Sequence, residues 1–282
     1  MNIFHAQSQL KQHLELVKTA AQTIGFVPTM GAIHNGHLSL LQQALDENDV
    51  VVMSIFVNPT QFNNADDLEK YPRTLERDVA LVEALSDKII VYAPSVDDIY
   101  EGNTIAKKFD YDGLENEMEG ANRPGHFDGV GTIVKKLFEI VAPNKAYFGE
   151  KDFQQLQIIR KMVQKAKMNI EIVGCPIHRQ NDGLAMSSRN ERLSEKAKEQ
   201  ATFLNRTLQN AKDLFANSEI GQVIEYVESE IKNHQAFQLE YFVIADEETL
   251  KAATTKEAGK KYRGFLVAHI EGVRLIDNIA LN

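Results

Sequence analysis

The chain has 282 residues, 43% of them hydrophobic, which is enough to bury one large core or two smaller ones. Its formal net charge of −9 excludes the broad basic surface that captures nucleic acid or an anionic membrane, so we expect neither as a partner. Cys175 is the single cysteine, which excludes an intrachain disulfide and a thiolate metal site.

The sequence shows no signal for export or membrane insertion. Residues 1–10 lack the basic start and apolar run of a secretory signal. The most apolar run, residues 50–57, is far shorter than the roughly 20 residues that span a bilayer. We expect this run to form a buried strand and the protein to stay in the cytosol.

The first part of the chain alternates apolar runs with segments of helical spacing. The expected strands cover residues 23–28, 50–57, 88–93, 146–148 and 170–173. The expected helices cover residues 36–47, 75–85, 129–141 and 153–167. This alternation predicts βαβ units, and the continuous apolar runs are typical of parallel strands buried on both faces.

The character of the sequence changes near residues 175–180. A polar loop over residues 179–192 leads to two further expected helices and to strands that could pair antiparallel. The helices cover residues 194–215 and 220–234, and the strands 239–245 and 264–281. We predict an α/β protein with a Rossmann-like, doubly wound parallel sheet in residues 1–176 and a smaller C-terminal α+β lid domain in residues 177–282.

The first chemically informative segment is Val-Pro-Thr-Met-Gly-Ala-Ile-His-Asn-Gly-His, residues 27–37, where a strand turns into a helix. Backbone N–H groups and the helix dipole converge at such a turn and favour a phosphate. His34 and His37 share a helical face and could stabilise charge on a phosphate under attack, as imidazolium or N–H donors. In this context HxGH is typical of the nucleotidyl-transferase superfamily, and the glycines disfavour a surface pair or a partial metal site.

A second segment, Tyr-Phe-Gly-Glu-Lys-Asp-Phe-Gln-Gln-Leu at residues 147–156, again joins a strand to a helix. Lys151 follows the carboxyl end of the strand, where open parallel sheets bind ligands, and could neutralise ATP phosphate oxygens. Asp152 also fits a helix N-cap, because Gln155 completes a capping-box spacing.

A third segment, residues 182–190, contains Ser187, Ser188 and Arg189 in a row. An exposed Ser-Ser-Arg is most often a solvated turn. Its position after the last parallel strand instead favours a mobile clamp on the β- and γ-phosphates.

These segments, together with residues 56–62, 71–74 and 119–127, closely resemble the pantoate–β-alanine ligase (pantothenate synthetase) family. The resemblance covers most of residues 23–192 and continues weakly to residues 275–278. It implies that ATP adenylates the carboxylate of (R)-pantoate and releases pyrophosphate, and that the amine of β-alanine then attacks the acyl adenylate to give pantothenate and AMP. It also implies Mg²⁺ on the ATP phosphates and a homodimer formed through the larger domain.

The resemblance assigns roles residue by residue. It makes His34, His37 and Lys151 catalytic, with His37 as a proton donor, and Asp78 a position that supports the metal. The ATP-binding residues that it implies are Met30, Gly31, Ala32, Ile33, His34, Asn35, Gly36, His37, Gly149, Glu150, Lys151, Asp152, His178, Met186, Ser187, Ser188 and Arg189. The residues that it implies for pantoate or β-alanine are Gln61, Gln155, Asn58, Tyr71, Glu119 and Arg123.

Two histidines stand apart from this assignment. By the resemblance, His178 occupies a position near the adenine where the family usually has an aliphatic residue, so a backbone contact there would survive and the side-chain packing on the base would change. We expect His126 to be structural or to start a helix. A buried Gln or Asn among the substrate-binding positions can also simply tie the backbone of a loop.

Three alternative functions remain open on the sequence. A tRNA synthetase would need an RNA-binding surface, which the acidic chain does not offer. A nicotinamide- or lipid-precursor nucleotidyl transferase would keep the nucleotide in its product. A non-catalytic nucleotide sensor would not need both histidines together with Lys151 and Arg189.

Overall fold

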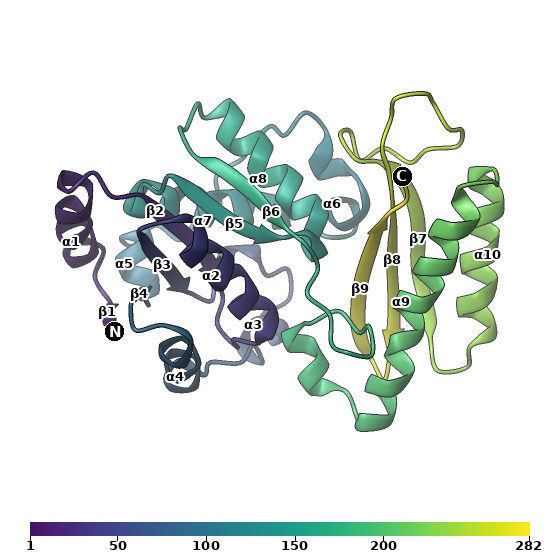
Figure 1. The fold of residues 1–282 in the computed structure, drawn as a ribbon, viewed down its shortest axis with the longest axis horizontal. Coiled ribbons are helices and arrows are strands. Elements are labelled where there is room, and N and C mark those ends of the chain that lie inside the picture. Colours follow the sequence, from purple (N-terminus) through teal and green to yellow (C-terminus); the bar gives the residue numbers. More distant parts are fainter. The chain divides into compact units, whose positions relative to one another are not determined.

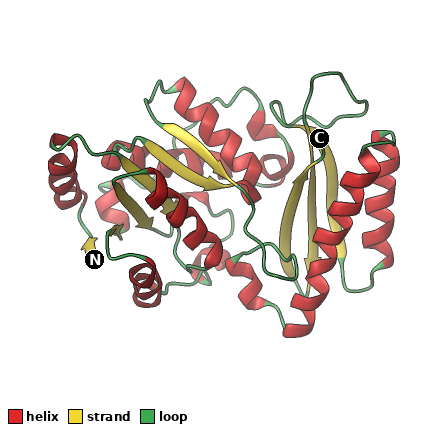
Figure 2. Ribbon diagram, in the orientation of Figure 1, coloured by secondary structure: helices red, strands yellow, loops and turns green.

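The computed structural model describes residues 1–282, except for the side chain of residue 67. The chain forms two compact units, Met1–Pro176 and Ile177–Asn282 (Figure 1). Helices and strands make up most of both units (Figure 2).

The N-terminal unit is built on a six-stranded sheet in which all paired neighbours run parallel. The strand order is β1-β4-β3-β2-β5-β6. The strands are β1 (Asn2–Phe4), β2 (Ile24–Thr29), β3 (Val50–Ile55), β4 (Ile89–Tyr92), β5 (Lys145–Gly149) and β6 (Glu171–Cys175). The chain builds outward from β2 to β3 and later adds β5 on the other side, so the sheet has its topological switch point at β2.

Helices pack on both faces of this sheet. The helices of the unit are α1 (Gln7–Thr19), α2 (Asn35–Glu47), α3 (Ala65–Glu69), α4 (Leu75–Leu85), α5 (Val96–Tyr100), α6 (Met118–Asn122), α7 (His126–Val141) and α8 (Phe153–Lys165). Val27 packs in a buried cluster with Leu41 of α2 and Val82 of α4. The next residue back, Phe26, points to the opposite face and meets Phe138 of α7 edge-on.

The C-terminal unit combines two helices with a three-stranded antiparallel sheet. The helices are α9 (Glu195–Phe215) and α10 (Ile220–Asn233), and the strands are β7 (Gln238–Asp246), β8 (Tyr262–Ile270) and β9 (Val273–Ala280). Buried side chains of both helices and all three strands form one core cluster, for example Leu208, Val227, Ile244, Leu266 and Leu275. This unit therefore has a hydrophobic core of its own.

The predicted fold class is confirmed, with differences at the ends of elements. The expected strands and helices are present, but α7 begins at His126 instead of residue 129. No expectation covered β1 and α1, which open the chain. Strand β1 has only three residues and is stabilised by parallel pairing with β4, a partner that is distant in sequence.

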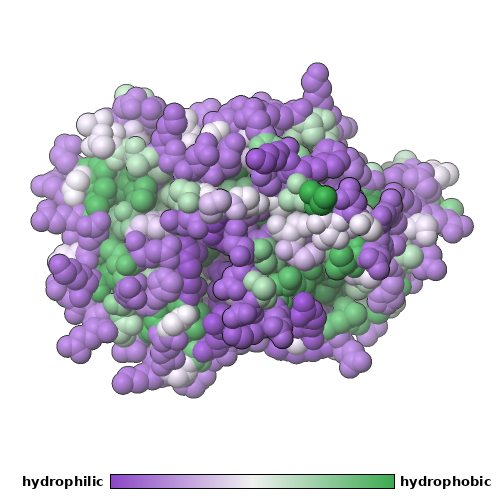
Figure 3. All heavy atoms as spheres, turned by 180° about the vertical axis from the view of Figure 1, so that it is seen from behind, coloured by the Kyte–Doolittle hydropathy of each residue, from purple (hydrophilic) through white to green (hydrophobic). Residues whose placement is uncertain are grey.

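The surface agrees with the polar composition of the chain. Hydrophilic residues cover most of the face seen in Figure 3, with smaller hydrophobic areas between them. Among the described residues, no helix combines the length and the apolar character that a membrane span requires.

Candidate active site

Three loops that carry predicted residues follow neighbouring strands of the parallel sheet. They come after β2, β3 and β5, and begin near residues 30, 56 and 150. Because the carboxyl ends of parallel strands lie at one edge of a sheet, the three loops share that edge at the switch point. The predicted histidines, Gln61 and Lys151 are all in these loops or in the helix turns that follow them.

The turn after β2 is fixed by a buried carboxylate. The N–H groups of Ala32 and Ile33 donate to the two oxygens of Asp78, at 2.9 and 2.8 Å, and the Thr74 hydroxyl donates to one of them at 3.1 Å. Gly31 and Ala32 both have positive φ, at 86° and 50°, which is uncommon for alanine. A Cβ at Gly31 would lie 3.0 Å from Asp78.

Asp78 therefore shapes the turn that precedes the two histidines. Its side chain is fully buried, and both of its oxygens already accept backbone hydrogen bonds. We conclude that Asp78 holds the turn in place. The role of Asp78 in supporting a metal ion stays a prediction.

The two histidines of the motif cap helix α2. His34 Nδ1 accepts from the N–H of Gly36 at 3.1 Å, and His37 Nδ1 accepts from the N–H of His34 at 3.4 Å. The two rings lie 4.0 Å apart between centroids, so the predicted common face is confirmed. Because each Nδ1 is an acceptor, the ring proton of each neutral histidine is on Nε2.

His37 is held in its neutral form. Burial lowers its pKa from 6.5 to about 3, with further lowering by the charges of His34 and Lys151. At neutral pH this histidine offers a neutral Nε2–H donor, and its imidazolium form is rare. Of the two forms left open by the sequence, the structure favours the N–H donor.

The loop after β3 is organised around the buried amide of Asn58. Its Nδ2 donates to Gln61 Oε1 at 3.0 Å and to the Gly129 carbonyl at 3.2 Å, while its Oδ1 accepts from the Tyr100 hydroxyl at 2.6 Å. The Gln61 amide in turn lies 3.2 Å from the sulfur of Met30, in the turn after β2. Asn58 thus orients Gln61 from within the protein. A contact between Asn58 itself and the substrate stays a prediction.

Helix α7 approaches this loop closely at Gly129. A Cβ there would lie 2.3 Å from the Thr60 carbonyl oxygen and 2.7 Å from Cα of Gln61, both backbone atoms. Only a residue without a side chain fits such a contact. The position of Gln61 therefore depends on the absence of a side chain at Gly129.

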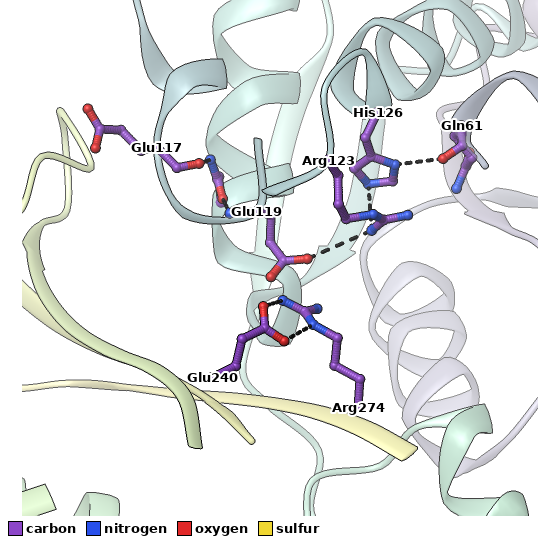
Figure 4. A network of polar contacts seen from close by, with 8 residues as sticks. Gln61, Glu117, Glu119, Arg123, His126, Glu240 and Arg274 are labelled. Atoms are coloured by element: carbon purple, nitrogen blue, oxygen red, sulfur yellow. Dashed lines mark hydrogen bonds and ion pairs between the residues drawn. The ribbon is translucent and has the colours of Figure 1, made fainter. Parts of the chain in front are cut away.

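A chain of polar contacts runs from helix α6 to the loop after β3 (Figure 4). Glu119 pairs with Arg123 at 3.8 Å, Arg123 donates to His126 Nε2 at 3.2 Å, and His126 Nδ1 donates to the carbonyl of Gln61 at 2.8 Å. Burial and the charge of Arg123 lower the pKa of His126 to about 4, so this ring is also neutral. The first residue of α7 is His126, which agrees with the structural role expected for it.

The turn after β5 carries Lys151 in a short 3-10 helix, η3 (Glu150–Asp152), directly before α8. Gln155 lies half-buried in the first turn of α8. Asp152 occupies the N-cap position, but its side chain makes no cap hydrogen bond. The capping box considered for Asp152 and Gln155 is therefore wrong, and it is the histidine pair that caps its helix instead.

Gln154 is a residue that the sequence reasoning missed. Its buried amide donates to the carbonyls of Leu114 and Glu117 at 2.9 and 2.8 Å and accepts from the N–H of Glu119 at 3.0 Å. One side chain of α8 thus holds the segment that carries Glu119. The signal in the sequence is weak, because Gln154 is one of two adjacent glutamines that follow Phe153.

Tyr71 lies in the segment that leads to α4. Its ring meets Phe62 edge-on, with centroids 5.7 Å apart, so it packs on the end of the loop after β3. Its predicted contact with substrate stays a prediction.

The remaining predicted residues belong to the C-terminal unit. His178 and Met186 face each other across a short hairpin, in which the N–H of Met186 donates to the His178 carbonyl at 3.0 Å. Ser187 caps the 3-10 helix η4 (Ser188–Arg192) by accepting from the N–H of Arg189 at 3.3 Å. The hairpin brings His178 beside the Ser-Ser-Arg segment, and their assignment to ATP stays a prediction.

The side chains described here include no group of three or more His, Cys, Asp or Glu arranged to hold a metal ion. Burial raises the pKa of the Cys175 thiol to about 12, which makes it a poor nucleophile and a poor metal ligand.

A family model described as pantoate-beta-alanine ligase matches residues 2–280 of the chain. A protein from Flavobacterium psychrophilum named pantothenate synthetase is 57% identical over 281 residues, covering 100% of both chains. The chain belongs to the pantoate–β-alanine ligase family. The six-stranded sheet and its flanking helices are therefore the N-terminal unit of a member of this family.

Solved structures of the family support this membership. A pantothenate synthetase from Thermus thermophilus is 38% identical and superposes with a TM-score of 0.89, covering 100% of this chain and 99% of the other. A pantoate–β-alanine ligase from Francisella tularensis is 37% identical with a TM-score of 0.81, covering 100% and 98%. That protein was solved as a complex with beta-gamma ATP and β-alanine.

Proposed function

We propose that this chain uses ATP to condense (R)-pantoate with β-alanine, giving pantothenate, AMP and pyrophosphate. Family membership over nearly the whole chain supports the reaction class. The observation that carries the proposal is that the histidine pair, Gln61 and Lys151 all lie at the carboxyl edge of one parallel sheet. That edge offers donors for phosphate beside neutral amides for an organic acid.

In the first proposed step, a carboxylate oxygen of pantoate attacks the α-phosphorus of ATP, and the bond to pyrophosphate breaks. Negative charge accumulates on the α-phosphate oxygens, which Nε2–H donors of His34 and His37 would stabilise. Lys151 would offset the charge that repels the incoming carboxylate. Since His37 is neutral, it acts in this proposal as a hydrogen-bond donor and not as an acid with a pKa near 7.

In the second proposed step, the amine of β-alanine attacks the acyl carbon of pantoyl adenylate. An amide bond forms, the acyl–phosphate bond breaks, and AMP leaves with its electron pair. The amine must arrive unprotonated, and one proton is lost to solvent as the amide forms.

We propose Gln61 and Gln155 as ligands of pantoate, since neutral amides can bind its hydroxyls and carboxylate without burying a further charge. Asn58, Tyr71, Glu119 and Arg123 support or line this region. Residues 30–37 and 149–152 would bind ATP, and His178 with residues 186–189 would contact its adenine and phosphates. The N-terminal unit is then the ATP- and pantoate-binding domain, and the C-terminal unit the lid domain.

Magnesium is proposed as an ion that enters with ATP. The described residues offer no three-ligand cluster of their own. Mg²⁺ commonly keeps several waters and binds phosphate oxygens with only one or two carboxylates, so this donor set fits an ion held mainly by ATP. Bound there, it would neutralise phosphate charge. The single, unreactive cysteine is compatible with a reducing cytosol, which we propose as the site of the reaction.

Product analysis of mixtures in which substrates are added in turn tests the function. The protein is incubated with Mg²⁺ and ATP alone, then with pantoate, with β-alanine, and with both, and AMP, pyrophosphate and pantothenate are quantified. We expect continuous AMP and pyrophosphate release only with both substrates, and ATP–pyrophosphate exchange that needs pantoate but not β-alanine. A product that retains the nucleotide would instead identify a nucleotidyl transferase, and ATP left intact with pantoate present would reject the ligase.

A further inference from the structure

The β8–β9 hairpin of the C-terminal unit holds the Ser-Ser-Arg segment from both sides. On one side, Asp277 of β9 binds Arg179, at the start of the hairpin formed by residues 178–186. On the other side, Glu271 in the turn between β8 and β9 binds Ser194, the N-cap of α9. Residues 186–189 lie between these two attachments.

The upstream attachment is the stronger of the two. The Arg179 guanidinium donates to both oxygens of Asp277, at 2.7 and 2.8 Å, and to the carbonyl of Gly183 at 3.1 Å. The Asp277 side chain is 5% exposed and that of Arg179 is 20% exposed. Two parallel, charge-assisted hydrogen bonds fix the angle as well as the distance of such a pair.

The same contacts fix the path of the chain into the segment. Arg179 pairs with Ala185 across the hairpin, and Leu184 packs into the core of the unit. The buried amide of Asn190 then donates to the carbonyl of Ala185 at 2.9 Å. These contacts connect Arg179 through Ala185 to the residues that follow it.

We propose that Asp277, acting through Arg179, is a positioning residue that sets the geometry of residues 186–189 for the ATP-dependent step. The inference rests on the proposed function, in which this segment binds the β- and γ-phosphates. Asp277 itself does not contact the nucleotide in this proposal. Its effect reaches ATP through the hairpin, so it changes the use of ATP and leaves the affinity for the other two substrates unchanged.

Strand β9 also provides a matched control. Arg274, three residues before Asp277, forms a bidentate pair with Glu240 of β7, at 2.8 and 2.9 Å (Figure 4). This pair joins two strands of the same sheet and lies outside the hairpin of residues 178–186. Breaking it tests what the loss of any salt bridge on β9 does to the enzyme.

The experiment compares Asp277→Asn, Arg179→Lys and Glu240→Gln with the unchanged protein. Asparagine retains the shape of Asp277 without its charge, and lysine retains the charge of Arg179 without the planar fork. Initial rates are measured with ATP, pantoate and β-alanine varied in turn. We expect both hairpin variants to lose about tenfold or more in kcat/KM for ATP, mainly through KM, with the KM values of pantoate and β-alanine within about twofold. Glu240→Gln should stay within about twofold throughout.

Limited trypsin digestion gives a second measurement that needs no turnover. Cleavage after Arg189 and Arg192 is followed by mass spectrometry with and without a non-hydrolysable ATP analogue. We expect faster cleavage in Asp277→Asn and Arg179→Lys than in Glu240→Gln. We also expect that higher concentrations of the analogue are needed to protect the two hairpin variants from cleavage.

Three outcomes would overturn the proposal. They are a fall in kcat with unchanged KM for ATP, an equal effect of Glu240→Gln, or unchanged digestion of the segment in both hairpin variants. Failure of the proposed function gives a different result, because the unchanged protein would then use no ATP when pantoate is present. In that case the digestion alone decides whether Asp277 holds the segment.

Discussion

His37 is half-buried and accepts a backbone N–H on Nδ1, and its desolvation and this hydrogen bond both disfavour the charged form. The only ring proton of the neutral form is then on Nε2, the atom that remains for a ligand. His34 Nδ1 likewise accepts a backbone N–H, from Gly36. The same hydrogen bonds therefore cap helix α2 and orient the two ring N–H donors.

Replacement of His37 tests whether a neutral donor is what the site needs. We expect His37→Ala to lower kcat/KM for ATP about 100-fold, because one stabilising contact in the transition state is lost. His37→Gln, which keeps a neutral N–H donor, should lose less. The ratio of the wild-type rate to the His37→Gln rate should stay constant from pH 8 to 5. A ratio that changes across pH 6.5 would show that the protonated ring takes part.

The lowered pKa values of His37 and His126 also predict how stability depends on pH. Their pKa values fall from 6.5 to about 3 in His37 and about 4 in His126, so the unfolded chain binds protons more readily. Their stabilising effect is present above pH 6.5 and is lost as pH falls from there towards the folded values. By urea unfolding, we expect His126→Gln to lose about 2 kcal/mol less stability than the wild type between pH 7 and pH 5. Equal losses would contradict a neutral His126.

Lys151 is the cation of the turn after β5, and its charge acts on His37. We expect Lys151→Ala to lower kcat by about 100-fold, since no other group of that turn is cationic and phosphate charge would be left without compensation. Lys161→Ala is the matched control, because this lysine of α8 pairs with the exposed Asp112 at 3.1 Å. Steady-state kinetics should show the control within about twofold of the wild type. A similar loss in both variants would point to the stability of α8 instead.

The helices and strands that could be predicted are those with a strong local pattern of apolar residues. Strands β2 and β3 are continuous apolar runs, and α7 repeats apolar residues on one face, so local sequence is enough to identify them. Strand β1 lacks such a pattern, because its pairing depends on β4, some 90 residues later in the chain. The first strand and helix were missed for this reason.

The candidate site follows the same rule. The loops after β2 and β5 were predictable, because glycine, histidine and lysine follow a recognisable strand. The partners that fix these loops were not, since Asp78 lies 46 residues from Ala32 and Asp277 lies 98 from Arg179. Gln154 was overlooked in favour of its neighbour Gln155, because only the packing of α8 shows which amide is buried.

Gly129 provides a test at the contact between two elements. In Gly129→Ala the new Cβ would meet backbone atoms of Thr60 and Gln61, so helix and loop must separate. We expect a loss of about 1–3 kcal/mol in urea unfolding. We also expect a higher KM for pantoate, because Gln61 moves with the loop.

The control for this variant is Gly221→Ala in α10, where a Cβ meets nothing within 4 Å. It should leave the rate unchanged and raise stability by up to about 0.5 kcal/mol, because alanine suits a helix better than glycine. If Gly129→Ala behaves like this control, the close approach of α7 does not position Gln61.

For the whole molecule, the distribution of exposed hydrophobic side chains differs between the two units. Among the described side chains, the large hydrophobic ones with the greatest exposure all belong to residues 1–176: Ile3, Leu16, Leu75, Val96 and Ile105. The C-terminal unit, in contrast, buries its large apolar side chains in its own core. An interface that covered some of these side chains would remove apolar surface from water.

The family resemblance implies a homodimer formed through the larger domain, and we propose on that basis that two chains associate through the N-terminal unit. Sedimentation equilibrium should give twice the 31.8 kDa mass of one chain. Ile105 is 70% exposed, so Ile105→Asp should not disturb a core but should weaken association, by about tenfold or more if the side chain is buried in the dimer. Lys232→Asp, on the exposed face of α10, should leave the dimer unchanged. A wild-type mass of one chain would contradict the dimer, and a Lys232→Asp monomer would move the interface to the C-terminal unit.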